Sequence, residues 1–221
     1  MKGGQTVKGI TFGTTHTYKD LGLILGKKEI GSPAVKENKL EIEGADGSID
    51  LTEVFGRPTY GDVTHKFTFS TIVPRSDFLT QYSTVKNALH GQKLRIILDD
   101  DPGFYYVGLC YVSSFTSEKG VGTISVDCDC EPYKYKLNKT VVTKAIDGAE
   151  AVVLTNGRKR AVPEITIATD TSLNIVYQVV NIWDLGAGSY TLPDLELVQG
   201  ENVVTVTGTG SITFEWQEGD L

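Results

Sequence analysis

The sequence FYYVGLCYVSSF at Phe104–Phe115, followed by GTISVDCDC at Gly122–Cys130, decides the fold class of this chain. Gly122–Cys130 alternates apolar and polar residues, Phe104–Phe115 is rich in aromatic and apolar residues, and Glu118–Gly122 between them is rich in turn-forming residues. Alternation with a period of two is typical of a strand with one buried face. The pattern therefore predicts two strands joined by a tight turn, part of a series of hairpins.

The composition of the whole chain favours the same class. The 221 residues include 25 Thr, 22 Val and 15 Ile, against 9 Ala, 18 Leu and 1 Met. Branching at Cβ suits a pleated strand and restricts side-chain rotamers in a helix. A chain of this length forms one large domain or two modest ones. We expect a mainly β protein.

One helix is predicted, over Ser76–His90, with Ser76 as a candidate N-cap and Gly91 as the C-terminal stop. Its apolar stripe, which should pack on a sheet, consists of Phe78, Leu79, Tyr82, Val85 and Leu89. Its polar face is assigned to Gln81, Ser83, Lys86 and Asn87.

The region before this helix is less regular. The chain up to Gly44 predicts two strands and a turn, and His65–Phe69 predicts another strand. Leu51–Asp62 contains too many turn residues for regular structure. We expect an ordered loop there, with Phe55 and Tyr60 as packing anchors.

The second half of the chain has a different character. Pro132 ends a strand, and a polar connector follows near Tyr133–Lys139. Beyond it the pattern gives short, evenly spaced strands typical of a β-sandwich. They are expected at 141–143, 151–155, 164–168, 173–180, 188–192, 196–198, 202–207 and 211–216. We therefore expect two domains, 1–135 and 136–221, the first carrying the single helix.

Charge and cysteine content narrow the function classes. With 21 Lys and Arg against 28 Asp and Glu, the net charge of −7 disfavours nucleic acid and anionic membrane as partners. The start MKGGQTVKGITFG lacks the apolar stretch of a secretory signal, which favours synthesis in a cytosol-like compartment. Cys110, Cys128 and Cys130 are interpreted as buried reduced thiols, with redox or metal use as the alternative.

No catalytic centre emerges from the sequence. His16, His65 and His90 neighbour no nucleophile motif. The acidic turn Asp99–Asp101 lacks the ligand spacing of a calcium loop and is interpreted as a solvated hairpin turn. We expect no catalytic residue, no metal site and no cofactor.

Aromatic residues of the second half are the remaining binding candidates. Aromatic faces bind sugar rings in β-sandwich lectins, although most aromatic side chains in a sandwich belong to its core. Trp183 precedes a glycine-rich turn and is the better candidate for exposure, with Tyr190, after that turn, as a further candidate. Trp216 belongs to an alternating strand and is expected in the core.

Several segments in order resemble the distal tail protein (Dit) family of siphophages and prophages of Gram-positive bacteria. They are DGSIDLTEVFGRPTYGDVTHKFTF at 46–69, KNALHG at 86–91, LDDDPGFYYVGLC at 98–110 and ISVDCDCEPYKY at 124–135. NGRKRAVPEITI, GSYTLPDLELVQGEN and the terminal Gly-Asp-Leu add to the match, which extends over nearly the whole chain.

The resemblance implies a structural, non-enzymatic role. It implies an N-terminal β-sandwich with one helix that forms a hexameric ring, and a C-terminal galectin-like or jelly-roll-like sandwich. The ring would link the tail tube protein to the tail-associated lysin hub and to receptor-binding or baseplate proteins. The expected location is the virion tail tip, after assembly in the bacterial cytoplasm.

Two sets of residues are candidates for contacts. Phe55, Arg57 and Tyr60 are of types enriched at interface cores and are candidates for the ring contact; they could equally anchor a surface loop within one protomer. Trp183 and Tyr190 are candidates for carbohydrate contact. The alternative function is a carbohydrate-binding β-sandwich module for adhesion to the host cell wall.

Overall fold

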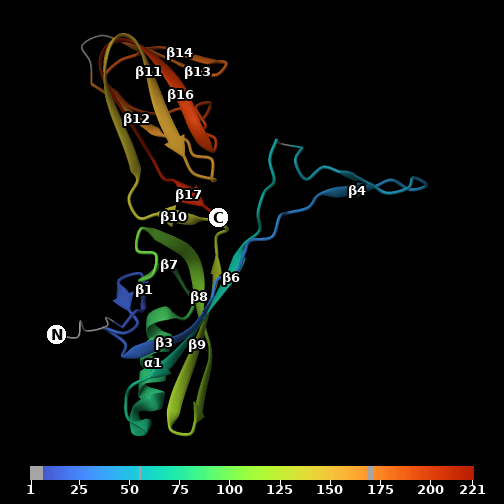
Figure 1. Ribbon diagram of the computed structural model, residues 1–221, viewed down its shortest axis with the longest axis vertical. Helices are drawn as coiled ribbons and strands as arrows, with labels where there is room; N and C mark the ends of the chain where they lie inside the picture. The colour runs from blue at the N-terminus through green and yellow to red at the C-terminus, as the bar shows by residue number, and fades with distance from the viewer. Residues whose placement is uncertain (1–6, 55, 169–171) are drawn as a thin grey trace, which may run out of the picture. The chain divides into compact units, whose positions relative to one another are not determined.

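The computed structural model describes residues 7–54, 56–168 and 172–221, and these form a mainly β protein with one α-helix (Figure 1). The chain divides into two compact units, Met1–Lys134 and Tyr135–Leu221, and each has its own buried core. The predicted fold class is confirmed.

The first unit is built on one antiparallel sheet with the strand order β2-β1-β7-β8-β9-β6-β3. Its strands are β1 (Ile10–Phe12), β2 (Thr15–His16), β3 (Leu23–Glu29), β6 (Val63–Thr71), β7 (Gln92–Leu98), β8 (Phe104–Glu118) and β9 (Val121–Cys130). Phe12 contacts Phe67 and Phe69 of β6 edge to face, with centroids 6.0 and 6.5 Å apart. Since three strands separate β1 from β6 in the sheet, the sheet curls until its two ends face each other across one core.

The helix α1 (Phe78–Leu89) packs against this sheet, and its C-terminal end agrees with the prediction. Its start differs: a 3₁₀ turn, η1 (Arg75–Asp77), precedes it, and the residue at the N-cap is Asp77, whose side chain makes no capping hydrogen bond. Ser76 is therefore not the N-cap.

Two residues of α1 exchange the faces that periodicity assigned to them. Leu79 is 68% exposed, whereas Gln81 is buried and donates from Nε2 to the carbonyl oxygens of Leu21 and Gly22, at 2.7 and 3.2 Å. Hydrogen bonds to the chain before β3 thus hold a polar side chain on the buried face.

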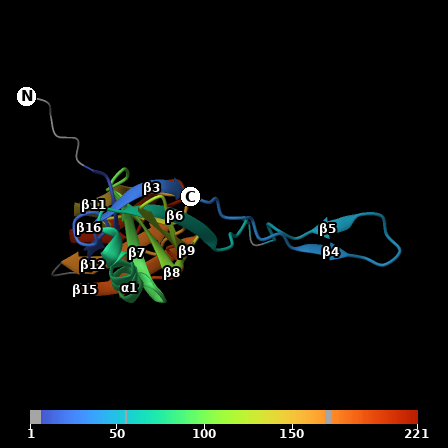
Figure 2. The same cartoon turned by 90° about the horizontal axis from the view of Figure 1, so that it is seen from below.

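Residues 30–62 leave the sheet between β3 and β6 and form a long excursion that we call the arm (Figures 1 and 2). It contains the two-stranded hairpin β4 (Lys39–Glu41) and β5 (Ser48–Asp50). Every residue from Ala34 to Asp50 is exposed. The predicted irregularity of Leu51–Asp62 is confirmed for the described residues 51–54 and 56–62, but the hairpin before them is an additional element that the prediction lacked.

The second unit is organised around two long paired strands. Its strands are β11 (Thr140–Asn156), β12 (Glu164–Ala168), β13 (Leu173–Tyr177), β14 (Val180–Leu185), β15 (Gly188–Thr191) and β16 (Gly200–Trp216). The short strands β10 (Lys134–Lys136) and β17 (Gly219–Asp220) pair with each other. The main sheet has the order β14-β13-β16-β12-β15, with β11 on β16.

Two opposed glycines divide the β11–β16 pair into two segments, and each segment has a different neighbouring strand. Gly148 of β11 lies opposite Gly208 of β16, and their φ values are +86° and +138°, which glycine adopts most easily. On one side of this pair β16 bonds to β12, and on the other side it bonds to β13. The neighbour of β16 therefore changes from β13 to β12 at the glycine pair.

These long strands correct the prediction of separate short ones. The expected strands 141–143 and 151–155 are parts of β11, and 202–207 and 211–216 are parts of β16. The expected strand 196–198 is reduced to a single bridge between Ala161 and Leu197, and β14 was not predicted. Only 164–168 has the expected bounds.

Candidate functional site

The hairpin of the arm has one apolar face and one polar face. Leu40 of β4 lies directly opposite Ile49 of β5, and Ile42 is two residues beyond Leu40, so the three side chains share a face. They are 51, 47 and 48% exposed, respectively. The other face carries Lys39, Glu41, Ser48 and Asp50. The apolar face is available to a partner, and the alternation LEIE and SIDL could have indicated it from the sequence.

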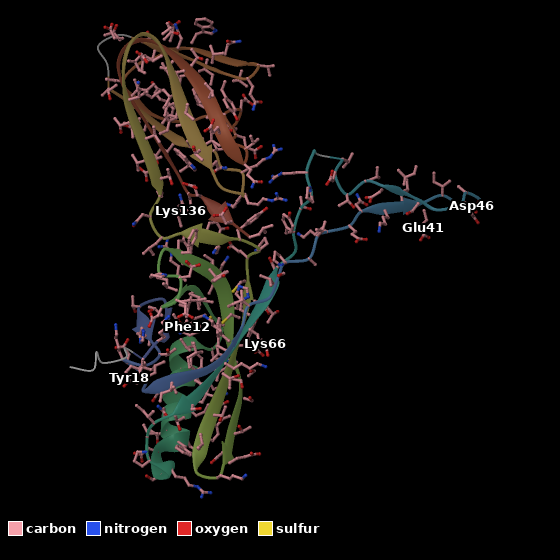
Figure 3. The ribbon with its side chains drawn as sticks, viewed as in Figure 1. Phe12, Tyr18, Glu41, Asp46, Lys66 and Lys136 are labelled. Carbon is pink, nitrogen blue, oxygen red and sulfur yellow. The ribbon has the colours of Figure 1, made fainter. Side chains whose placement is uncertain are left out.

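At the base of the arm, backbone hydrogen bonds join its two chain segments to each other, and a ring contact joins it to the rest of the first unit. Lys36 N–H donates to the Thr59 carbonyl at 2.8 Å, and Gly61 N–H to that of Ala34 at 2.9 Å. The ring of Tyr60 contacts Tyr133 edge to face at 5.9 Å. Figure 3 shows Glu41 and Asp46 far out on the arm, away from Phe12 and Lys66 on the sheet.

Two of the ring-contact candidates, Arg57 and Tyr60, lie in or near this base. Tyr60 and Arg57 are half-buried. Tyr60 packs on Tyr133, and both residues keep some surface that a partner could contact. Phe55 lies outside the described residues. The structure thus brings Tyr60 against the first unit, as a packing anchor would be.

His65 lies where the arm leaves β6. Its Nδ1 accepts a hydrogen bond from Gly31 N–H at 3.2 Å, and its ring contacts Tyr106 at 4.6 Å. Burial lowers the pKa of His65, which favours the neutral ring. This histidine is structural, since it fixes the first residues of the arm.

The acidic turn joins the paired strands β7 and β8, and Asp100 is exposed, so the interpretation as a solvated hairpin turn is confirmed; its three carboxylates also brace the turn. Asp99 Oδ2 accepts hydrogen bonds from Gly9 N–H at 2.8 Å and from His16 Nε2 at 3.1 Å. Asp100 pairs with Lys8 at 2.7 Å and also with Lys28 of β3. Asp101 pairs with Lys134 at 3.0 Å. Each carboxylate therefore connects the turn to a different part of the first unit.

The three cysteines are fully buried free thiols. Cys110 and Cys128 lie opposite each other on β8 and β9, and their Sγ atoms are 3.3 Å apart. The hydrogen bond to Cys110, together with burial, raises the pKa of Cys128; burial raises that of Cys130 to about 12. The interpretation as buried reduced thiols is confirmed, and such thiols are poor nucleophiles.

The carbohydrate candidates lie on different strands. Trp183 of β14 is 63% exposed, at a register irregularity between β13 and β14 where Asp184 has a φ of +58°. Tyr190 of β15 is half-buried against the core and donates from its hydroxyl to the Gly186 carbonyl at 3.1 Å. Trp216 is 2% exposed, a core residue as expected. Because β14 and β15 are at opposite ends of the strand order, the topology gives no pairing of these two side chains.

Groups of three or more His, Cys, Asp or Glu placed to hold a metal ion do not occur in the part of the chain that the structure describes. No helix within the described ranges is long and apolar enough to span a bilayer. His90 accepts a hydrogen bond from Val112 N–H at 3.1 Å at the end of α1.

Together these features define a class: a two-unit β protein with one helix, a braced curled sheet and an exposed, amphipathic arm. No model of a known protein family matches the chain, and no curated protein matches it by sequence. Its fold nevertheless matches a solved structure over almost its full length.

That structure is the crystal structure of the SPP1 Dit protein (gp 19.1), described as a paradigm of the hub adsorption apparatus in phages that infect Gram-positive bacteria. The TM-score is 0.72, with 98% of this chain and 100% of that chain covered, at 14% sequence identity. The resemblance to the distal tail proteins predicted from the sequence is thus confirmed at the level of the fold.

Proposed function

We propose that this chain is a structural component of a phage tail, a distal tail hub. Six copies form a ring that links the tail tube protein to the tail-associated lysin and to baseplate or receptor-binding proteins. The ring lies at the virion tail tip and is assembled in the host cytoplasm. The match of 98% of the chain to the fold of a hub adsorption protein carries this proposal.

The two units have different roles in the proposal. The first, residues 1–135 by the sequence boundary, forms the ring, and the second, 136–221, is a galectin-like sandwich that faces outward. The role is non-enzymatic, since neither the histidines nor the acidic turn are arranged as an acid, base or nucleophile: they accept hydrogen bonds and form ion pairs within the fold.

The exposed arm is the feature that favours a contact between neighbouring copies in the ring. An isolated two-stranded hairpin is only marginally stable in water, and this one leaves Leu40, Ile42 and Ile49 without cover in its own chain. If the apolar face packs on a neighbouring copy, each copy both gives and receives an arm. Such a heterologous contact closes into a ring when the rotation between copies allows it. Phe55, Arg57 and Tyr60 remain the candidates for the rest of this contact.

The experiment compares two faces of the same hairpin. The double variant Leu40→Lys and Ile49→Lys places charge on the apolar face, and we expect it to abolish the ring in negative-stain micrographs. The matched control, Glu41→Lys with Ser48→Lys, adds two lysines to the polar face and should leave the ring intact. Equal assembly of both variants, with unchanged circular dichroism, would remove the arm from the ring contact.

A second function, carbohydrate binding for cell-wall adhesion, is favoured by Trp183. Its side chain is exposed on β14 at a register irregularity, a feature that re-aims side chains. Pull-down of the full chain with host cell walls tests this function, with Trp183→Ala expected to abolish binding. Val179→Ala, which changes a 91% exposed residue just before β14, is the control. Wall binding that survives Trp183→Ala would exclude the tryptophan platform.

A further inference from the structure

The strand β11 has a free edge of unusual length. It pairs with β16 along all seventeen residues, without a register shift, and no other strand within the described residues pairs with it. The edge strands β14 and β15 of the same sheet have six and four residues, and β14 carries a register irregularity. Proteins normally keep sheet edges short, bulged or interrupted by proline, because a long edge offers unpaired backbone groups to another chain.

The half of β11 beyond Gly148 is the part best suited to a partner strand. Ala149, Ala151, Val153 and Thr155 are exposed on its outer face, while the residues between them face the core or lie half-buried. On β16, Thr207, Thr205 and Val203 lie opposite the first three of these and are also exposed. The outer surface beside this edge is therefore small, β-branched and uncharged over about 20 Å.

Acidic residues mark both ends of this uncharged stretch. Asp147 precedes it on β11, and Glu201 lies opposite Thr155 on β16; both are exposed. Neither forms an ion pair within the described part of the chain. The residues 136–221 contain 6 Lys and Arg against 11 Asp and Glu, with no Lys or Arg after Arg160, so the surroundings are also acidic.

We propose that the edge at Ala149–Asn156 takes up an extended strand of a partner protein by β-strand addition. The strand it fits has an uncharged, β-branched middle of seven or so residues with Lys or Arg at each end. Backbone hydrogen bonds to β11 give affinity. One end charge lies beside Asp147 on β11 and the other reaches across Thr155 to Glu201 on β16, and together they set the register. A single chain presents this edge by itself, so the inference does not depend on the proposed ring.

The test uses the full chain and a capped nonapeptide, Lys-Thr-Val-Thr-Val-Thr-Val-Thr-Lys, as the probe, because its two lysines are eight residues apart, as Asp147 and Thr155 are on β11. Hydrogen exchange with mass spectrometry should show slower exchange in residues 149–156 when the peptide is added at millimolar concentration. Peptide fluorescence anisotropy should show affinity about three-fold weaker for Asp147→Lys and for Glu201→Lys, the size expected for one exposed ion pair. The matched controls are a nonapeptide with Glu at both ends and one N-methylated at alternate residues, and both should bind more weakly.

Several outcomes would overturn the proposal. These are protection at another edge such as Val180–Leu185, equal binding of the N-methylated peptide, affinity unchanged in both charge variants, or no protection at millimolar peptide. Protection of 149–156 by a soluble cell-wall glycan, without any by the peptide, would assign the surface to sugar instead. Loss of the ring in the arm variants affects none of these readouts, so the two proposals fail separately.

Discussion

Asp99, Asp100 and Asp101 connect one turn to the N-terminal strand region, to β3 and to Lys134. From the sequence, three adjacent carboxylates in a Pro-Gly turn indicate exposure to solvent, because their cationic partners are up to 92 positions away along the chain. Gln81 is a similar case: helical periodicity places it on the polar face, and only the carbonyls of Leu21 and Gly22 explain its burial. Such contacts depend on tertiary structure and cannot be predicted from local pattern.

The brace makes stability depend on pH in a predictable direction. Hydrogen bonds from Lys28 and Lys8 lower the pKa of Asp100 from 3.8 to about 2. A folded-state pKa below the unfolded one means that the stabilisation is present above pH 3.8 and is lost as the pH falls towards 2. We expect Asp100→Asn to lower the urea midpoint at pH 6 and to have little effect near pH 2. An Asp100→Asn difference that stays constant across this range would contradict the brace.

The burial of the cysteines predicts that thiol reactivity differs sharply between the native and the unfolded protein. Because Cys110, Cys128 and Cys130 are fully buried, with the pKa of Cys128 and Cys130 raised, a maleimide reagent should label them only as the protein opens. All three should then react together in denaturant. Ser113→Cys, which places a thiol at an exposed position of β8, is the control and should react at once. Rapid labelling of any native cysteine would show that the β8–β9 core is more open than described.

At the scale of elements, period-two and helical patterns predicted the existence of most strands and of α1, but not where long strands continue. Gly148, Gly208 and Gly210 interrupt the apolar alternation and indicate turns in the sequence, although in the structure they lie within β11 and β16. Glycine breaks the pattern because it has no side chain, yet its positive φ allows a paired strand to bend without ending. The hairpin of the arm was missed for a related reason: its two alternating stretches are only three residues long and flank a turn-rich segment.

The two opposed glycines should differ in their sensitivity to substitution. A Cβ at Gly148 would contact nothing within 4 Å, so Gly148→Ala adds only backbone strain, about 1 kcal/mol. At Gly208 a Cβ would lie 2.6 Å from Leu173 Cδ2 and 3.0 Å from the Ser172 carbonyl oxygen. Gly208→Ala should therefore cost about 2–4 kcal/mol in urea unfolding. Equal losses for the two variants would contradict the close approach of β13 to β16.

For the whole molecule, the resemblance of ordered motifs predicted the fold that the structural match to SPP1 Dit confirms at 14% identity. Composition alone gave only a β-rich, acidic chain. The contact residues could not be predicted as securely, because interface side chains have no periodic signature. Tyr60 packs on its own unit. The more exposed apolar face consists of Leu40, Ile42 and Ile49. We therefore propose the apolar face of the arm as the assembly surface and the edge of β11 as a second docking surface.

Native mass spectrometry of the full chain and the two arm double variants, over a range of concentrations, is the decisive test of the proposed ring. We expect a six-copy species that grows with concentration in the wild type and in the polar-face variant, Glu41→Lys with Ser48→Lys. We expect only single copies for Leu40→Lys with Ile49→Lys. A wild-type chain that stays a single copy at the highest concentration, or a hexamer that the apolar-face variant forms equally well, would contradict it.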